Sequence, residues 1–473
     1  MLGGGDLMPK NIFVGVGISK DNDPFKAGKE AVSQAVTKMR EQSEADPNFG
    51  VVFCSGGKYG KNTKTIQKLV NGVHSVLSRY NECKWIGCTT AGEIFQEKVE
   101  HGSVVAMVIS SKFIKCGVGI GENLSENPVE AGRKAAHQAL NDLKMDKYVD
   151  AYISYLSTKA SKPSELIKQR QFAILTLPAG LTIKKSGWED SMLDGIKEVV
   201  GNTPIIGGSA GDDLRFIKTY QFANGKVYED SVVLSVIFSN LKLGFGLMHG
   251  FEPTDKIALV TKAKGNVVYE LNHRPAAEVY AEMIGVSKKE LLKGSGLMAN
   301  KSGNLKLRAI KFAESVGITP KLLLKRLPFY KFAIESPFGI PDISGNYLAK
   351  GPKCIIQDKY IEFYNRVPVN MPLTLLTMNE EKTAMVESLA IKKSVEEVGK
   401  PALMLIFDCI VRYAYLEDRL NKVYKRIESE TKDIPKIGFY TYGEQGFMKN
   451  MLAGHHAYTC VVLCIGDKLI TQK

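Results

Sequence analysis

The sequence predicts a mixed α/β protein, of α/β (α+β) class, in which repeated strand–helix–strand units form two layered αβ subdomains. Three features of the chain favour this class: an apolar run that ends in a glycine-containing turn and a carboxylate, a second apolar run upstream of it, and a third downstream. All three features occur three times. The turns lie at 85–93, 205–212 and 437–444, the upstream runs at 51–54, 172–175 and 403–407, and the downstream runs at 103–109, 231–237 and 459–464.

The spacing between the upstream runs and the turns is nearly constant. It is 33, 32 and 31 residues, measured from Cys54, Leu175 and Phe407 to the next turn glycine. This is close to the length of one strand, one helix and a second strand. Equivalent turns at the ends of equivalent strands indicate that the turns line a common site.

The N-terminal half contains a second repeated pattern. A strand with alternating glycines is expected at 11–17, and the Asp and Pro at 23–24 are typical of a helix start. The same pattern recurs at 115–132 and, in altered form, at 243–254, and the glycine pairs 117/244 and 119/246 are 127 residues apart. We therefore expect an internal duplication of about 10–125 and 126–260.

The helices follow from apolar residues spaced three and four apart, with charged residues opposite. They are expected at 25–42, 62–80, 128–143, 187–201, 274–284, 380–398 and 411–429. A domain boundary is expected between about 245 and 285, which divides the chain into an N-terminal domain at 10–260 and a C-terminal domain at 261–470.

Composition indicates a globular protein, with 44% hydrophobic and 24% charged residues. No stretch approaches the roughly 20 apolar residues of a membrane span, and the first residues lack the pattern of a secretion signal. The eight cysteines are scattered, several of them within apolar runs, as in a reducing compartment. A cytoplasmic location is the expectation.

A metal site is not expected. No pair of cysteines has zinc-ligand spacing, and Cys460 and Cys464 lie on one face of an expected strand, which suits packing. The histidines are dispersed except for His455 and His456, which are adjacent and would face opposite sides of a strand.

The segment 285–335 carries much of the net charge. Residues 288–331 include eleven basic and two acidic residues, so this segment contributes +9 of the total net charge of +13. The stretch 321–327 has the pattern of a basic amphipathic helix that contacts nucleic acid, anionic lipid or an acidic partner. A helix whose charged face is simply solvated also explains this pattern. We favour that explanation, because no series of aromatic residues interleaves with the charges. Nucleic acid is not an expected partner.

The glycine-containing turns suggest anion binding. Glycine allows close approach of the backbone, so that amide groups point at a bound anion or carboxylate. The amides near Thr90, Gly92, Ser209 and Gly211 are the candidates. The motif does not match a phosphate-binding loop, and a tight turn without a ligand is the simpler explanation of any one copy. The threefold recurrence favours a shared site.

Charged side chains add to this hypothesis. Glu93, Asp212 and Glu444 close the three turns and are candidates to bind an ammonium group. Arg412, four residues after Asp408, is suited to bind a carboxylate with both guanidinium arms, although a surface ion pair would also explain it.

Catalysis is not expected. Ser209 lacks the Gly-x-Ser-x-Gly elbow of a nucleophilic serine, and no histidine is evidently paired with it. His249 ends an apolar strand beside a glycine, and His455 precedes the last strand. Each is either a core histidine or a ligand-facing one.

The ordered motifs resemble the FIST sensory domain, named for F-box and intracellular signal transduction proteins. The resemblance extends from about residue 10 to 470. It rests on 85–94, 207–213, 222–225, 230–234, 249–253 and 275–276 in the N-terminal half, and on 402–409, Arg412, 438–444, His455 and Leu463 in the C-terminal half.

This resemblance implies a non-enzymatic sensory protein that binds a small ligand, such as an amino acid or a similar small anion, without a cofactor. No kinase, cyclase, chemotaxis or F-box segment is visible, so output would pass to a separate signalling protein. The alternatives are a haem-containing nitric-oxide sensor with His249 or His455 as axial ligand, and a protein-interaction scaffold. The candidate ligand-binding residues are Thr89, Thr90, Gly92, Glu93, Gly208, Ser209, Gly211, Asp212, His249, Arg412, Tyr442, Glu444 and His455.

Overall fold

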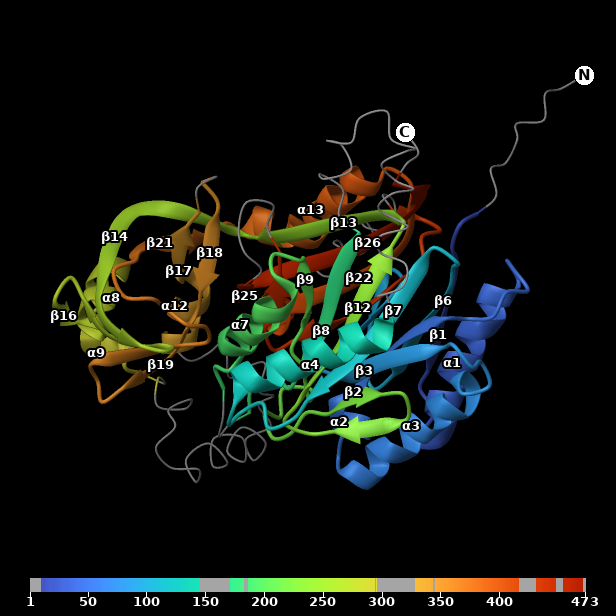
Figure 1. The fold of residues 1–473 in the computed structure, drawn as a ribbon. Coiled ribbons are helices and arrows are strands. Elements are labelled where there is room, and N and C mark those ends of the chain that lie inside the picture. Colours follow the sequence, from blue (N-terminus) through green and yellow to red (C-terminus); the bar gives the residue numbers. More distant parts are fainter. Residues whose placement is uncertain are drawn as a thin grey trace, which may run out of the picture.

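The structure is a computed structural model, and it folds into three similar α/β units and one inserted lobe (Figure 1). The mixed α/β class and the layered architecture predicted from the sequence are confirmed. The residues described are 10–144, 171–182, 186–293, 295, 328–342, 345–416, 431–447 and 454–470.

The first unit is a sheet with strand order β1-β6-β2-β3, in which β2 and β3 are parallel and the other neighbours antiparallel. Its strands are β1 (Phe13–Ser19), β2 (Phe49–Ser55), β3 (Lys84–Thr90) and β6 (Val104–Ser110), and its helices are α1 (Pro24–Arg40), α2 (Gly56–Tyr59) and α3 (Thr63–Leu77).

The second and third units repeat this order, as β7-β12-β8-β9 and β13-β26-β22-β23. The second unit contains β7 (Ile114–Gly121), α4 (Pro128–Leu143), β8 (Phe172–Pro178), α7 (Glu189–Val200), β9 (Ile205–Gly208) and β12 (Val232–Ser239). The third contains β13 (Leu241–His249), α13 (Glu380–Val398), β22 (Pro401–Cys409), α14 (Ile410–Leu416), β23 (Lys436–Thr441) and β26 (Thr459–Leu469).

The expected helices are confirmed to within a few residues, apart from the last. α1 begins as its sequence predicts, because the Asp23 carboxylate accepts the amide of Lys26 at 2.8 Å and Pro24 occupies the first turn. The helix expected at 411–429 is α14 as far as Leu416, and residues 417–430 lie outside the described ranges.

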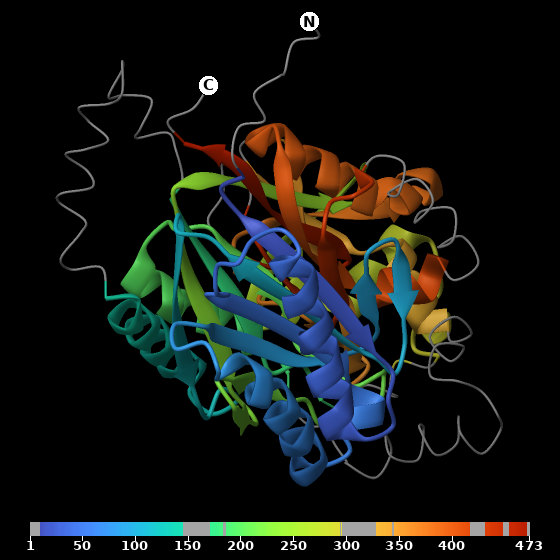
Figure 2. The same cartoon turned by 90° about the vertical axis from the view of Figure 1, so that its right-hand side faces the viewer.

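The three sheets enclose a common apolar core, and the helices lie on their outer faces (Figure 2). At the centre, the ring centroid of Phe53 is 6.1 Å from that of Phe407 and 4.7 Å from that of Phe439. Because each sheet is covered on both faces, its central strands are apolar without alternation. This burial explains the continuous apolar runs in the sequence.

The alternating glycines of the first strands let a helix lie directly on each sheet. A Cβ at Gly17 would be 2.0 Å from the carbonyl oxygen of Ala31, one at Gly119 would be 1.9 Å from that of Ala135, and one at Gly246 would be 1.8 Å from that of Ala390. The helices α1, α4 and α13 supply these carbonyls. The glycine pattern is therefore a requirement of helix–sheet contact.

Each unit donates a hairpin to the sheet of another unit. The hairpin β4–β5 of the first unit pairs with β23, the hairpin β10–β11 of the second pairs with β3, and the hairpin β24–β25 of the third pairs with β9. The exchange therefore forms a closed ring. The hairpin strands are β4 (Glu93–Phe95), β5 (Lys98–Glu100), β10 (Gln221–Ala223), β11 (Lys226–Tyr228), β24 (Glu444–Gly446) and β25 (Gly454–His456).

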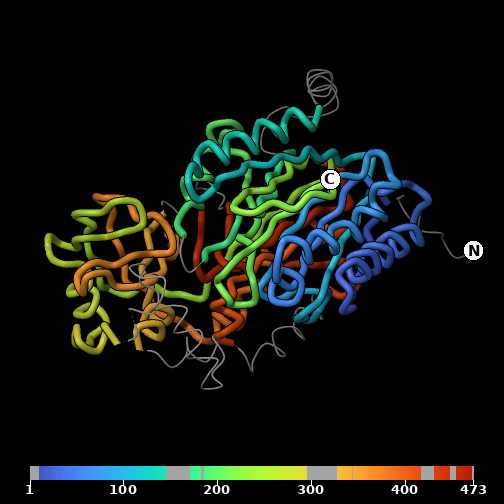
Figure 3. Tube along the Cα trace, turned by 90° about the horizontal axis from the view of Figure 1, so that it is seen from below, coloured from blue at the N-terminus to red at the C-terminus, as the bar shows by residue number. Residues whose placement is uncertain are grey.

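The lobe is inserted between β13 and α13 and stands beside the three-unit core (Figure 3). It has its own apolar cluster around Tyr280, Phe338 and Phe363. Its elements are β14 (Phe251–Lys264), β15 (Val267–Leu271), β16 (Arg274–Pro275), α8 (Ala276–Ile284), α9 (Lys288–Leu291), α12 (Pro328–Glu335), β17 (Phe338–Pro341), β18 (Tyr347–Lys350), β19 (Pro352–Ile356), β20 (Tyr360–Phe363) and β21 (Pro372–Met378).

Two sequence predictions concern the region of this lobe. Residue 260, the expected limit of the N-terminal domain, lies within β14, and the boundary stays a prediction. The basic stretch 321–327 lies outside the described residues. Among the helices that the structure describes, none has the length and apolar character to cross a membrane.

Gly119→Ala should destabilise the fold by about 2–3 kcal/mol, because the added methyl group must push α4 away from β7. Chemical denaturation measures the free energy of unfolding. Lys134→Ala, on the exposed side of α4, is the control and should change that energy by less than about 0.5 kcal/mol. Equal midpoints for Gly119→Ala and the unmodified protein would contradict this account of the glycine pattern.

Candidate functional site

The three turns meet and hold one another by backbone hydrogen bonds. The amide of Gly211 donates to the carbonyl of Thr89 at 2.9 Å, that of Tyr440 to Gly92 at 2.9 Å, and that of Ser209 to Gly443 at 2.8 Å. The structure thus brings together segments that are more than 100 residues apart in the chain.

These bonds change the expected role of the turn amides. The amides of Ser209 and Gly211 are occupied by carbonyls of neighbouring turns, so they do not present an anion site. Gly208 is paired with Glu444 in the ladder between β9 and β24, and Thr89 exchanges hydrogen bonds with the backbone of Tyr220. The turns serve here as the junction of the three units.

Glu93 and Glu444 are buried at equivalent positions, each at the start of a donated hairpin. Glu93 contacts the hydroxyl of Thr90 and accepts the amide and hydroxyl of Ser103 at 3.0 and 2.6 Å. Glu444 contacts the hydroxyl of Thr441 at 2.5 Å and accepts the amide and hydroxyl of Thr459. Burial raises the pKa of both carboxyls to about 8, so both are mostly protonated at neutral pH.

The counterpart of these residues in the second unit is Gln221, and not Asp212 as the sequence suggested. Gln221 begins β10, and its side-chain oxygen accepts the hydroxyl of Ser231 at 3.1 Å. Asp212 instead accepts the amides of Phe216, Ile217 and Lys218 and so folds the loop between the turn and the hairpin. Among the three described turns, only the turn of the second unit is separated from its hairpin by such a loop.

Arg412 does not face a cleft. Its Nε donates to Oδ1 of Asp408 at 2.7 Å, its Nη2 to Oδ2 at 3.2 Å, and its Nη1 to the carbonyl of Thr383. The pair is buried, and Asp408 raises the pKa of the guanidinium against the effect of burial. The expected role as a carboxylate-binding residue does not match this geometry, in which the pair ties β22 to α13.

His249 joins the core to the inserted lobe. Its Nδ1 accepts the amide of Phe251 at 3.2 Å, so its Nε2 carries the proton and donates to the carbonyl of Tyr347 at 2.9 Å. Burial lowers its pKa to about 4. Both ring nitrogens are in use, which leaves no lone pair for a haem iron.

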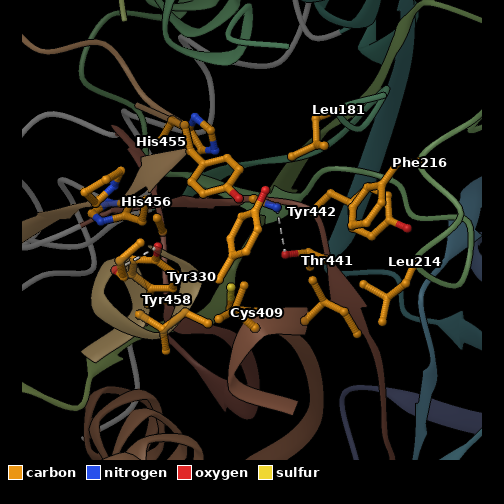
Figure 4. A pocket seen from close by; sticks show the side chains of 18 residues that line it. Leu181, Leu214, Phe216, Tyr330, Cys409, Thr441, Tyr442, His455, His456 and Tyr458 are labelled. Atoms are coloured by element: carbon orange, nitrogen blue, oxygen red, sulfur yellow. Dashed lines mark hydrogen bonds between the residues drawn. The ribbon is translucent and has the colours of Figure 1, made fainter. Parts of the chain in front are cut away.

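A cavity lies between the third turn and the inserted lobe (Figure 4). The space that the centre of a water molecule can reach is about 50 Å³. This space has room for a few waters or a small group and is far too small for a porphyrin. It is lined by Leu181, Leu214, Phe216, Tyr330, Ala333, Ile334, Pro352, Tyr364, Cys409, Ile410, Val411, Thr441, Tyr442, Gly443, His455, His456, Ala457 and Tyr458.

Tyr442 and His455 are the predicted site residues that line this cavity. The hydroxyl of Tyr442 donates to Asp212 at 2.6 Å, so its ring forms a fixed wall. His455 is 3% exposed, and within the described residues neither of its ring nitrogens has a hydrogen-bond partner. The hydroxyl of Tyr330, on α12, is also buried and also has no hydrogen-bond partner within the described residues. Burial of polar atoms without partners is costly, which marks this cavity as the candidate site.

The sequence interpretation missed Glu189 and Gln445, which lie behind His455. Oε2 of Glu189 is 4.0 Å from Nδ1 of His455, and its Oε1 accepts the hydroxyl of Ser209 at 3.5 Å. Nε2 of Gln445 donates to the same hydroxyl at 3.0 Å. Glu189 occupies the first turn of α7, where acidic residues are common, so its sequence context gives no functional signal. Gln445 directly follows Glu444, a predicted site residue, and this position in the sequence was the signal that could have identified it.

The fold and cavity define a multi-sheet α/β protein with a pocket where an inserted lobe meets the core. Residues 48–274 match the FIST N domain and residues 321–447 match the FIST C domain. The chain belongs to the FIST domain family, as its motifs predicted. FIST domains are generally sensory and signal-transduction domains.

A relative in the archaeon Methanocaldococcus jannaschii, itself described as an uncharacterized protein, is 30% identical over 290 residues. The match covers 57% of this chain and about half the length of the relative. The family membership and the relative's description leave the ligand open.

Two solved structures show weak similarity. A cyanuric acid hydrolase from A. caulinodans is matched with a TM-score of 0.25 at 10% identity, covering 49% of this chain and 72% of that one. The PurLQS structure from Thermotoga maritima is matched with a TM-score of 0.20 at 8% identity, covering 97% and 73%. At these scores neither similarity bears on the function.

Glu444→Gln should flatten the pH dependence of stability. The folded protein holds this proton up to about pH 8, whereas an unfolded glutamate loses it near pH 4.5, so the free energy of unfolding falls as pH rises between these values. Glutamine keeps the hydrogen bonds without the ionisation, as Gln221 does in the second unit. The variant should be more stable than the unmodified protein at pH 8, by about 2–4 kcal/mol.

Denaturation midpoints between pH 5 and 9 test this. The exposed Glu41→Gln should leave the profile unchanged. A profile for Glu444→Gln parallel to that of the unmodified protein would show that Glu444 is ionised in the folded chain.

Proposed function

We propose that this protein is a cytoplasmic sensor that binds a small ligand in the cavity between the third turn and the inserted lobe. The ligand class we propose is an amino acid or a similar small polar molecule with an apolar body. The observation that carries the proposal is the pair of unpaired buried polar groups, those of His455 and Tyr330, in an otherwise apolar and aromatic pocket.

The composition of the wall supports a ligand of this shape. Leu181, Leu214, Phe216 and Val411 offer apolar contact, while a ligand group that reaches His455 satisfies ring nitrogens that are otherwise unpaired. Pockets of this kind, apolar with a few convergent polar groups and placed between lobes, are typical binding sites. The cytoplasmic assignment is supported by the scattered free cysteines, which suit a reducing compartment.

We propose binding without catalysis. Cys409 lines the cavity, but burial raises the pKa of its thiol well above the usual value, so the nucleophilic thiolate is disfavoured. We propose that the cavity only binds the ligand, and that the resulting signal passes to a separate signalling protein.

Native mass spectrometry of the purified protein, followed by thermal unfolding with a panel of the twenty amino acids, tests the proposal. A true ligand should raise the unfolding temperature in a concentration-dependent manner. Ala333→Trp, which fills the cavity, should abolish the rise, whereas Ile257→Ala, at a 61% exposed position on the lobe, should keep it. A ligand that still stabilises Ala333→Trp would place the binding site elsewhere.

A further inference from the structure

The polar groups behind the cavity form one connected cluster, defined here as Glu189, Ser209, Gln445 and His455. Gln445 and His455 are direct cross-strand partners in the β24–β25 ladder, so their side chains share a face of the hairpin. Ser209 links Gln445 to Glu189, and Glu189 faces His455. All four are buried, with Glu189 at 1% and Gln445 at 0% exposure.

Hydrogen-bond acceptors outnumber donors in this cluster. Oε2 of Glu189, Oε1 of Gln445 and both ring nitrogens of His455 have no partner among the described residues. The orientation of the Gln445 amide is fixed, because its nitrogen also donates to the carbonyl of Gly443 at 3.2 Å. A neutral imidazole supplies one donor and one acceptor. The cluster therefore offers three acceptors and one donor, apart from any proton on Glu189.

The distance between Glu189 and His455 suits a donor that bridges the two side chains. At 4.0 Å, Oε2 of Glu189 and Nδ1 of His455 are too far apart for a direct hydrogen bond. A nitrogen set to one side can lie about 2.9 Å from both, which is the usual length of an N–H···O bond. Glycine at position 443 lets the His455 ring pack directly against the third turn, since a Cβ there would be 2.3 Å from Nε2 of His455.

We propose that the cavity takes a primary amine, whose ammonium group enters past His455 and is held by Glu189, Gln445 and His455. This inference rests on the proposed function and names the chemistry of the ligand's polar end. An ammonium group supplies three donors and matches the three acceptors, whereas a carboxylate supplies none. The amine's apolar body occupies the aromatic part of the cavity.

The surrounding charges leave Glu189 as the group that balances the ammonium. On α7, Asp190 interacts with Lys350 of β18 and also with His455. Lys353 of β19 pairs with Glu362 of β20 at 2.6 Å, and Arg366 pairs with Asp194 at 2.7 Å. His456, beside His455, stays neutral because burial lowers its pKa to about 3.

Binding should release a proton. Burial raises the pKa of Glu189 to about 8, so its carboxyl is mostly protonated at pH 7 and must ionise to pair with an ammonium. An alkylamine keeps its own proton up to about pH 10. Its affinity should therefore rise by up to about tenfold per pH unit between pH 6 and 8 and level off above pH 8.

Isothermal titration calorimetry of the full chain tests the inference with n-butylamine, butyltrimethylammonium, butyrate and n-butanol. Butylamine should bind, and the other three should bind at least tenfold more weakly, because they lack the N–H groups or the charge. Measurement at pH 7 in two buffers of different protonation enthalpy should show release of most of one proton for butylamine.

Glu189→Gln should weaken butylamine at least tenfold and remove the proton release. The control is Glu198→Gln on the same helix, where the side chain is half exposed and pairs with Arg133. The proton count on the unmodified protein keeps the inference testable even if Glu189→Gln fails to fold.

The outcomes separate this inference from the proposed function. Butyrate or butanol binding more tightly than butylamine would overturn the amine assignment and leave the cavity as the ligand site. Butylamine binding without proton release would remove Glu189 from the site and overturn the inference as stated. If none of the four probes binds and Ala333→Trp has no effect on any co-purifying ligand, both proposals fail.

Discussion

The structure depends on the mutual hydrogen bonding of the three turns where the three units meet. No unit completes its own sheet: β3, β9 and β23 each take their outer neighbour from a hairpin of another unit. An exposed strand edge invites aggregation, and the ring of donated hairpins removes three such edges at once. It also carries Glu93, Gln221 and Glu444 to equivalent buried positions. There they accept hydroxyl groups of residues at or just before the start of β6, β12 and β26.

The two kinds of buried carboxyl in this protein have different consequences. Glu93 and Glu444 have hydrogen-bond partners on both oxygens, as structural polar groups in a core do. Glu189 has a partner on one oxygen, and its other oxygen faces the unpaired ring of His455. A fold optimised for stability alone would pair or remove such groups. The local defect is therefore evidence of a site, because departures from self-consistency concentrate where a protein binds or reacts.

Local sequence patterns predicted much of the fold and little of the site. The helices and the three turns follow from periodicity and spacing, and the glycine pairs follow from helix–sheet contact at Gly119 and Gly246. Asp212 misled because it aligns with Glu93 and Glu444 in sequence, while the loop that follows it moves Gln221 into the structural position. The importance of Glu189 arises from packing of α7 against β25, which are more than 250 residues apart in the chain, so no local pattern reveals it.

The position of the cavity makes its occupant a contact between two parts of the chain. The lobe is tied to the core where β13 continues into β14 and where β21 leads into α13, and at this point the amide of Asn379 donates to the carbonyl of Gly250. On the far side, Lys353 of the lobe reaches Ser186 at 2.5 Å, and Arg366 reaches Asp194 of α7. Tyr330 and Ala333 belong to the lobe, whereas Tyr442 and His455 belong to the core, and all four line the cavity. The binding energy of a molecule in the cavity therefore depends on how the lobe and the core are placed relative to each other. A ligand whose affinity differs between two such arrangements shifts the balance between them, and this shift is what allows a bound molecule to be sensed.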